Sequence, residues 1–174
     1  NMQAAGADLS EHWITGTTLT GADFSGASLR RCSLRGTDLT AADLTGTDLT
    51  GADLQGATLT DAVLTGADFT GCLTDTTTAW PDEPPPGVLM LGPGLQAPGA
   101  DFTGHILYGR NLSGANLSKA RLHSTTLNQV NFTGANLSEA DLRGASMEEA
   151  HLSQADLSGA DLTGVRMKRQ SAFG

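Results

Sequence analysis

The sequence has little cysteine, few aromatic residues and little charge. Only two of its 174 residues are Cys, while aromatic residues make up 5% and charged residues 17%. Two cysteines are too few to indicate a disulfide framework or a CxxC metal site. No apolar run approaches the roughly 20 residues of a membrane-spanning helix, and no basic segment followed by an apolar one indicates a signal peptide. These absences predict a cytoplasmic protein with no membrane span, unless a signal peptide has been removed.

Positive charge is also scarce, since 10 basic residues stand against 19 acidic ones and the net charge is −9. An acidic protein repels phosphate groups, so we expect no direct binding of nucleic acid. The acidity is uneven. Residues 1–74 carry nine acidic and three basic residues, residues 75–99 carry three acidic and no basic residues, and residues 100–174 carry seven of each. The negative charge therefore belongs to the first half of the chain and the short stretch after it.

What the sequence does have is a repeat of five residues, most regular between Thr37 and Phe69. A large apolar residue, here called the centre, returns at every fifth position from Leu9 to Phe69. It returns again, in a different phase, from Phe102 to Met167. Two places before the centre, at what we call the inward position, lies a small residue. One place before the centre Asp or Asn is frequent, and two places after it Gly is frequent. With only 39% apolar residues, composition alone cannot produce so long a series.

A period of five fits neither a helix nor a flat strand. A helix would spread the centres around its surface, and a straight strand would alternate them between its two faces. A chain that turns a corner every five residues would aim every centre inward, and four corners would close a coil of about 20 residues. Such coils stack at about 4.8 Å, the spacing of paired strands. Each coil buries little without its neighbours, as in other solenoids.

Units such as ADLTG, ADLQG and ADLSG resemble the pentapeptide-repeat family, whose pattern is A(D/N)LXX. The resemblance covers residues 7–71 and 100–168. It implies a bacterial, often cyanobacterial, protein with an all-β fold. That fold is a right-handed quadrilateral β-helix, or solenoid, of about seven coils, interrupted by a proline-rich loop.

The interruption separates two repeat blocks. All six prolines lie between Pro81 and Pro98, and proline cannot donate to a β-ladder. We expect a first block at residues 1–73, a proline-rich insert at 74–99 and a second block at 100–174, together forming one continuous solenoid. The insert is either a plain surface loop or hinge, or a recognition loop that uses Trp80, Asp82 and Glu83. Its apolar residues 88–91 are expected to pack on the coils.

The acidic residues have two interpretations. Asp at the position before a centre can accept a hydrogen bond from the corner backbone, which would make it structural. The family resemblance suggests a second interpretation, because some members resemble double-stranded DNA in size, shape and charge and bind DNA gyrase. A neutral second half and a basic tail, Arg166, Lys168 and Arg169, disfavour that role here.

Catalysis has no support in the sequence. The four histidines are dispersed, and no Ser/His/Asp or Cys/His set shares one coil and one side. His12 and His105 are expected to point inward and His123 outward. Cys32 and Cys72 take inward positions two coils apart, about 10 Å, which exceeds the roughly 7 Å limit for a disulfide. We therefore predict two buried free thiols, no enzymatic activity, no catalytic or cofactor-binding residues, no cofactor and no metal.

The sequence thus favours a rigid, non-catalytic scaffold that binds an unknown protein partner. The alternative is a DNA mimic that binds DNA gyrase or another topoisomerase and protects it from quinolones. An end-to-end homodimer is also expected, because Leu9 and Ile14 at one end, and Met167 and Phe173 at the other, would otherwise face solvent. The candidate partner contacts lie where the repeat is broken: Trp80, Asp82, Glu83, Trp13 and Tyr108.

Overall fold

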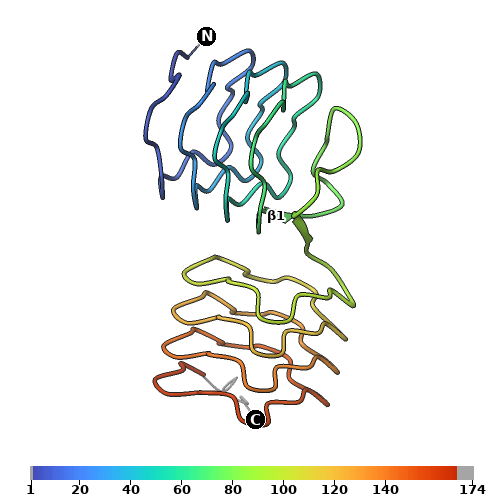
Figure 1. The fold of residues 1–174 in the computed structure, drawn as a ribbon. Helices are drawn as coiled ribbons and strands as arrows, with labels where there is room; N and C mark the ends of the chain where they lie inside the picture. The colour runs from blue at the N-terminus through green and yellow to red at the C-terminus, as the bar shows by residue number, and fades with distance from the viewer. Residues whose placement is uncertain (1, 168–174) are drawn as a thin grey trace, which may run out of the picture. The chain divides into compact units, whose positions relative to one another are not determined.

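In the computed structural model, which describes residues 2–167, the chain winds into stacked four-sided coils (Figure 1). Residues that precede a centre pair in parallel with residues 20 positions later, except that Thr58 pairs with Ala79. These pairs form four columns in the first part of the chain and four in the second. The first four columns start at Gln3, Asp8, Trp13 and Thr18, and the second four start at Gln96, Asp101, Ile106 and Asn111. The predicted four-sided coil is therefore confirmed.

The coils form two compact units, Asn1–Met90 and Leu91–Gly174. Regular strands are limited to β1 (Leu73–Thr74) and β2 (Leu89–Met90), which pair in parallel with Leu73 opposite Leu89. No helix that could cross a membrane occurs among the described residues. The prediction that one solenoid of about seven coils runs through both units is not tested by the pairing within each unit, and it stays a prediction.

The core of each unit is the column of centres inside the coils. Phe24 and Leu49 in the first unit and Phe132 in the second have no exposed surface. Small inward residues pack beside them, and several tie one coil to the previous one. The Thr47 hydroxyl, for example, donates to the Phe24 carbonyl at 2.8 Å. Apolar burial and these cross-coil hydrogen bonds together hold the stack.

Both cysteines take part in this arrangement. The Cys32 thiol donates to the Leu9 carbonyl at 2.7 Å, and the Cys72 thiol donates to the Leu49 carbonyl at 2.9 Å. Both are buried and free, as predicted. Burial raises the pKa of each thiol above its ordinary value. They therefore act as small core residues rather than as reactive groups.

Each corner is a four-residue turn closed by a backbone hydrogen bond. In one of them the Ala22 N–H donates to the Leu19 carbonyl at 3.0 Å, and the third turn residue, Gly21, has φ +61°. A left-handed residue at that place explains the frequent Gly two positions after the centre. Some corners carry another residue in the same conformation, including Ala41 with φ +54°.

Replacing Ala41 by Gly is expected to raise the free energy of unfolding by about 0.5–1 kcal/mol. A left-handed conformation costs an L-residue about 1–2 kcal/mol, which exceeds the extra chain entropy that Gly loses on folding. Urea denaturation measures the change. Ala5→Gly is the matched control, because Ala5 is exposed but has no positive φ, and it should lose about 0.5–1 kcal/mol. A loss of stability in Ala41→Gly would contradict the strain argument.

The proline-rich stretch is partly built into the first unit. Thr74 lies fully buried at a centre position, and Ala79 pairs with Thr58 although it lies one position beyond the regular spacing. β2 then returns to pair with β1. Val88 packs against the core of the first unit, as expected for the apolar segment. Residues 80–88 are thus a short excursion between two paired segments, and the ladder of the second unit already begins at Gln96.

The outermost coils are less buried than the middle ones. Leu9 and Ile14 are half-buried in the first unit, and Met167 is 50% exposed in the second. Phe173, Lys168 and Arg169, which entered the predictions for the dimer and the basic tail, lie outside the described residues. The end-to-end homodimer stays a prediction.

Candidate interaction site

The aspartates of the repeat are first of all structural. Each of them accepts a hydrogen bond from the backbone N–H two residues later, as Asp43 does from Thr45 at 2.9 Å. This bond supports the chain where it enters the corner. It is made by every Asp that precedes a centre: Asp8, Asp23, Asp38, Asp43, Asp48, Asp53, Asp68, Asp101, Asp141, Asp156 and Asp161. The structural interpretation of these residues is therefore confirmed.

In Asp8 and Asp68 the same bonds favour the ionised carboxylate. Hydrogen bonds from the Ser10 hydroxyl and backbone lower the pKa of Asp8 below its ordinary value. The Thr70 side chain and backbone do the same for Asp68. A hydrogen bond to the charged form of a carboxyl group favours that form. These residues thus carry full negative charge at neutral pH.

One side of the first unit is acidic. Its column runs Asp8, Ser28, Asp48 and Asp68. The Arg30 guanidinium pairs with Asp48 at 3.0 Å, which leaves the two outer carboxylates of the column with negative charge. This side is the part of the molecule that most nearly fits the DNA-mimic hypothesis.

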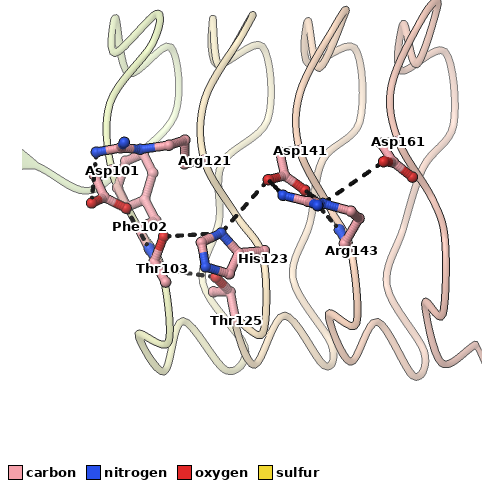
Figure 2. A network of polar contacts seen from close by, with 9 residues as sticks. All are labelled: Asp101, Phe102, Thr103, Arg121, His123, Thr125, Asp141, Arg143 and Asp161. Atoms are coloured by element: carbon pink, nitrogen blue, oxygen red, sulfur yellow. Dashed lines mark hydrogen bonds and ion pairs between the residues drawn. The ribbon is translucent and has the colours of Figure 1, made fainter.

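The second unit instead carries a mixed ladder of charges, shown in Figure 2. Arg121 follows Asp101 in one column and pairs with it at 2.9 Å. Further along the ladder, Arg143 lies 2.7 Å from Asp141 and 3.7 Å from Asp161. The His123 ring nitrogen lies 3.6 Å from Asp141 and 3.3 Å from the Thr103 hydroxyl. Acids and bases alternate here, so this side of the second unit is not a continuous negative surface.

Replacing Asp141 by Asn is expected to lower the melting temperature by about 2 °C at pH 7 and by clearly less at pH 2. The hydrogen bond from the Arg143 side chain, with that from its backbone N–H, lowers the pKa of Asp141 to about 2 from the ordinary value of 3.8. Because the folded pKa is the lower one, the carboxylate stabilises the fold above about pH 4. This contribution is lost as the pH falls through about 2.

The matched control for that experiment is Asp82→Asn. Asp82 is exposed and makes no hydrogen bond or ion pair with any described residue, so its replacement should change neither melting temperature. Thermal unfolding followed by circular dichroism at both pH values gives the comparison. If Asp141→Asn destabilised the protein equally at pH 7 and pH 2, the ion pairs would not be the cause.

The predicted contact residues do not gather in one place. Trp13 is 74% exposed on a side of the first unit, and Tyr108 is 52% exposed in the second unit. Asp82 and Glu83 are exposed in the excursion of residues 80–88. Trp80 is half-buried, with its ring edge-to-face against Phe69 at a centroid distance of 5.4 Å. Three separate exposed features therefore remain: Trp13, Tyr108 and the acidic pair in the excursion. Trp80 belongs to the excursion and packs against the core residue Phe69.

The histidines form no site with one another. His12, which was expected to point inward, is exposed, and its ring nitrogen is bonded to the Ser10 carbonyl at 2.9 Å. It lies in the first coil, which no described coil precedes. His123 points outward, as predicted, with 38% of its side chain exposed. His105 is half-buried. Among the described residues, no three side chains of His, Cys, Asp or Glu are grouped as metal ligands.

The ladder around Arg121 and Arg143 was missed by reasoning from the sequence. Its signal was present, because residues 20 positions apart share a column, and Asp101, Arg121, Asp141 and Asp161 have that spacing. The ion pairs of Arg143 depend on side-chain conformation, and the repeat pattern does not contain that information.

Comparison with known proteins agrees with the coil geometry. The family model described as pentapeptide repeats matches residues 5–46, 37–73, 99–134 and 131–169. These matches cover most of both units. The chain belongs to the pentapeptide-repeat family. A β-helix of pentapeptide repeats is therefore the fold of each unit. No curated protein gives a significant match.

Several solved structures are similar to this pentapeptide-repeat protein. HetL, a pentapeptide repeat protein involved in heterocyst differentiation regulation from the cyanobacterium Nostoc, is 30% identical, over 95% of this chain and 76% of HetL, with a TM-score of 0.42. QnrB1, a plasmid-mediated fluoroquinolone resistance protein, is 21% identical, over 97% of this chain and 78% of its own, with a TM-score of 0.42. A pentapeptide repeat protein of the Arabidopsis thaliana thylakoid lumen is 29% identical to this chain. The match covers 80% of this chain and 71% of the Arabidopsis chain, with a TM-score of 0.29.

Proposed function

We propose that this pentapeptide-repeat protein is a non-enzymatic scaffold of the bacterial cytoplasm that binds another protein. One observation carries the proposal: polar side chains of the regular repeat are engaged within the fold, while the most exposed large hydrophobic side chain among the described residues lies where the repeat is broken. The repeat aspartates bond the corner backbone, as Asp43 bonds Thr45. Trp13, by contrast, replaces the usual Asp of the repeat and is 74% exposed.

The proposed contacts are the exposed features at the breaks in the repeat. Trp13 and Tyr108 offer large rigid surfaces, and such aromatic residues dominate the binding energy of protein interfaces. Asp82 and Glu83 would add charge that selects the partner. Trp80 would act by holding the residues that follow it, since its ring packs on Phe69. A rigid stack of coils suits this role because it presents contacts without reordering on binding.

The scaffold proposal is tested by affinity capture from cells that express the full chain, with variants of the contacts. A true partner is enriched by the wild type and by the control Val63→Ala, which truncates an apolar side chain that is 47% exposed. The same partner should be lost, at least tenfold, with Trp13→Ala or Tyr108→Ala. If no protein distinguishes the contact variants from the control, the proposed contacts are wrong.

A second candidate function is supported by the acidic side of the first unit. Its Asp8, Asp48 and Asp68 lie in one column and would resemble a short row of phosphates. In this case the protein would bind DNA gyrase or a related topoisomerase in place of DNA. The test is a gyrase supercoiling assay with the full chain and with a variant in which these three residues are Asn. If the protein is only a scaffold, neither the wild type nor the variant should inhibit supercoiling by gyrase. If the wild type inhibits supercoiling and the variant does not, the DNA-mimic function is established.

A further inference from the structure

The last full coil of the first unit has one side whose outer edge is unpaired. This side, residues 62–66, is here called the open edge. Among the described residues, none forms a hydrogen bond with the Ala62 carbonyl or with the backbone N–H groups of Leu64 and Gly66. Leu64 is half-buried and Gly66 is exposed, whereas Leu44, the equivalent centre one coil earlier, has no exposed surface. The open edge is therefore a row of backbone groups within reach of a partner.

The open edge exists because the chain has no donor at the place that the repeat would pair with it. Ala79 pairs with Thr58 at an offset one residue longer than the regular spacing. With that offset, Pro84 would lie beside the open edge, and proline has no backbone N–H to donate to a ladder. The next described backbone bond to this coil joins the Gly71 N–H to the Gly87 carbonyl at 2.9 Å. One side of the coil is therefore left without a partner strand.

The preceding coil shows what the open edge can bind. There, Val63 donates its N–H to the Ala42 carbonyl at 2.9 Å and accepts from the Leu44 N–H at 2.9 Å. Two residues later, the Thr65 carbonyl accepts from the Gly46 N–H at 2.9 Å. The open edge offers the same set one coil further, namely one acceptor and two donors. It can therefore hold three successive residues of an extended strand that runs parallel to it, with the middle side chain over the apolar centre of the open edge.

The charge around the open edge indicates what should flank that strand. Asp61 and Asp68 lie on either side of the open edge, and both are exposed. Residues 36–109 contain no Lys or Arg. A second copy that used the same edge would bring the same acidic residues and be repelled. A strand flanked by Lys or Arg would instead be attracted to it.

We propose that the open edge binds an extended segment of a partner protein by β-strand addition, and that this segment has a large apolar residue flanked by Lys or Arg. The backbone bonds supply affinity, and the apolar and charged side chains select the segment. This inference rests on the proposed scaffold function and adds a contact of different chemistry to Trp13 and Tyr108. Because the bonds use the backbone of the open edge, Val63→Ala leaves them intact.

A simpler interpretation is that the open edge is only a by-product of the proline-rich excursion. Natural proteins usually protect an exposed edge with charged residues, proline or a covering segment. Residues 62–66 contain neither charge nor proline. Their outward residue is Val63, although the same column carries Asp23 and Asp43 in the two coils before it, and a β-branched residue favours a strand. The two interpretations differ because only strand addition depends on the Leu64 N–H.

The probe for this site is a fluorescein-labelled peptide, Lys-Lys-Val-Leu-Thr-Lys-Lys, whose core repeats residues Val63–Thr65. Fluorescence anisotropy follows its binding to the full chain. We expect saturable binding that weakens as salt is added. Methylation of the valine nitrogen of the peptide removes the donor to the Ala62 carbonyl and should weaken binding about tenfold. Replacing the four lysines of the peptide by Glu should also weaken binding about tenfold or more.

Two variants test the same bonds from the side of the protein. Leu64→Pro removes one N–H of the open edge, and proline is tolerated at an edge where the N–H makes no bond within the fold. Leu64→Ala is the matched control, because it loses the side chain but keeps the N–H. Leu64→Pro should bind the peptide about tenfold more weakly than Leu64→Ala. Circular dichroism establishes that both are folded, and the methylated peptide tests the proposal on the wild type if Leu64→Pro is not.

Three results would overturn the inference: the wild type does not bind the peptide at about 1 mM, the methylated peptide binds as tightly as its parent, or the two Leu64 variants bind the peptide equally. A wild-type dimer that Leu64→Pro converts to a monomer in light scattering would assign the open edge to a second copy and would also overturn it. The scaffold proposal fails separately, because its test is the capture of a partner through Trp13 and Tyr108.

Discussion

Replacing Phe132 by Ala is expected to lower the free energy of unfolding by about 3–5 kcal/mol, the usual cost of removing a fully buried aromatic ring. Phe132 has no exposed surface. The coil around it cannot close on the cavity, because backbone bonds such as that from the Phe132 N–H to the His151 carbonyl fix the spacing of successive coils. The missing atoms would leave unfilled volume in the column of centres. Urea denaturation followed by circular dichroism measures the loss.

The control for this prediction is Val63→Ala. Val63 is 47% exposed, so its truncation should change the free energy of unfolding by no more than about 0.5 kcal/mol. Both tryptophans lie in the first unit. Tryptophan fluorescence therefore reports the first unit alone, and circular dichroism reports both. A loss below about 1 kcal/mol in Phe132→Ala would mean that the centres do not form a close-packed core.

Replacing Trp80 by Ala is expected to cost about 2–3 kcal/mol, less than for a fully buried ring because Trp80 is half-buried. The variant loses the edge-to-face contact with Phe69 at 5.4 Å. It also releases the start of the excursion of residues 80–88 from the core residue Phe69. Urea denaturation followed by circular dichroism gives the stability.

Trp80→Phe separates packing from hydrogen bonding. The Trp80 indole nitrogen is buried and has no hydrogen-bond partner among the described residues. Leaving such a donor unpaired costs about 1–3 kcal/mol, and Phe removes the donor while keeping a ring against Phe69. We expect Trp80→Phe to be within about 1 kcal/mol of the wild type. A loss as large as that of Trp80→Ala would show that the indole nitrogen contributes a bond.

The period of the sequence predicted most of the fold because each part of the five-residue unit has one physical task. Leu49 fills the coil, Asp48 supports the corner and Gly51 turns it with φ +68°. Such tasks depend on residues within one coil, so the sequence states them directly. The same logic placed Cys32 and Cys72 in the core.

The exceptions depend on segments that meet across longer distances. The prolines predicted where the β-ladder loses hydrogen-bond donors. They did not predict that Leu89 would return to pair with Leu73. Trp80 looked like a contact residue because its unit is irregular, yet an aromatic side chain packs equally well on a core residue such as Phe69. His12 occupies an inward position, but it has no described coil on one side to enclose it. In each case the neighbour that decides the outcome lies outside the local pattern.

The pairing of residues 20 positions apart also sets how this molecule can change in length. Inserting a single pentapeptide at a corner would move every later side chain of that unit by one side, so that columns such as Asp101–Arg121 would meet new neighbours. Inserting four pentapeptides would restore every column and add one coil. The single extra residue between Thr58 and Ala79 is absorbed without losing their pairing. Growth by whole coils, with small irregularities confined to corners, is therefore the form of duplication and insertion that this architecture tolerates best.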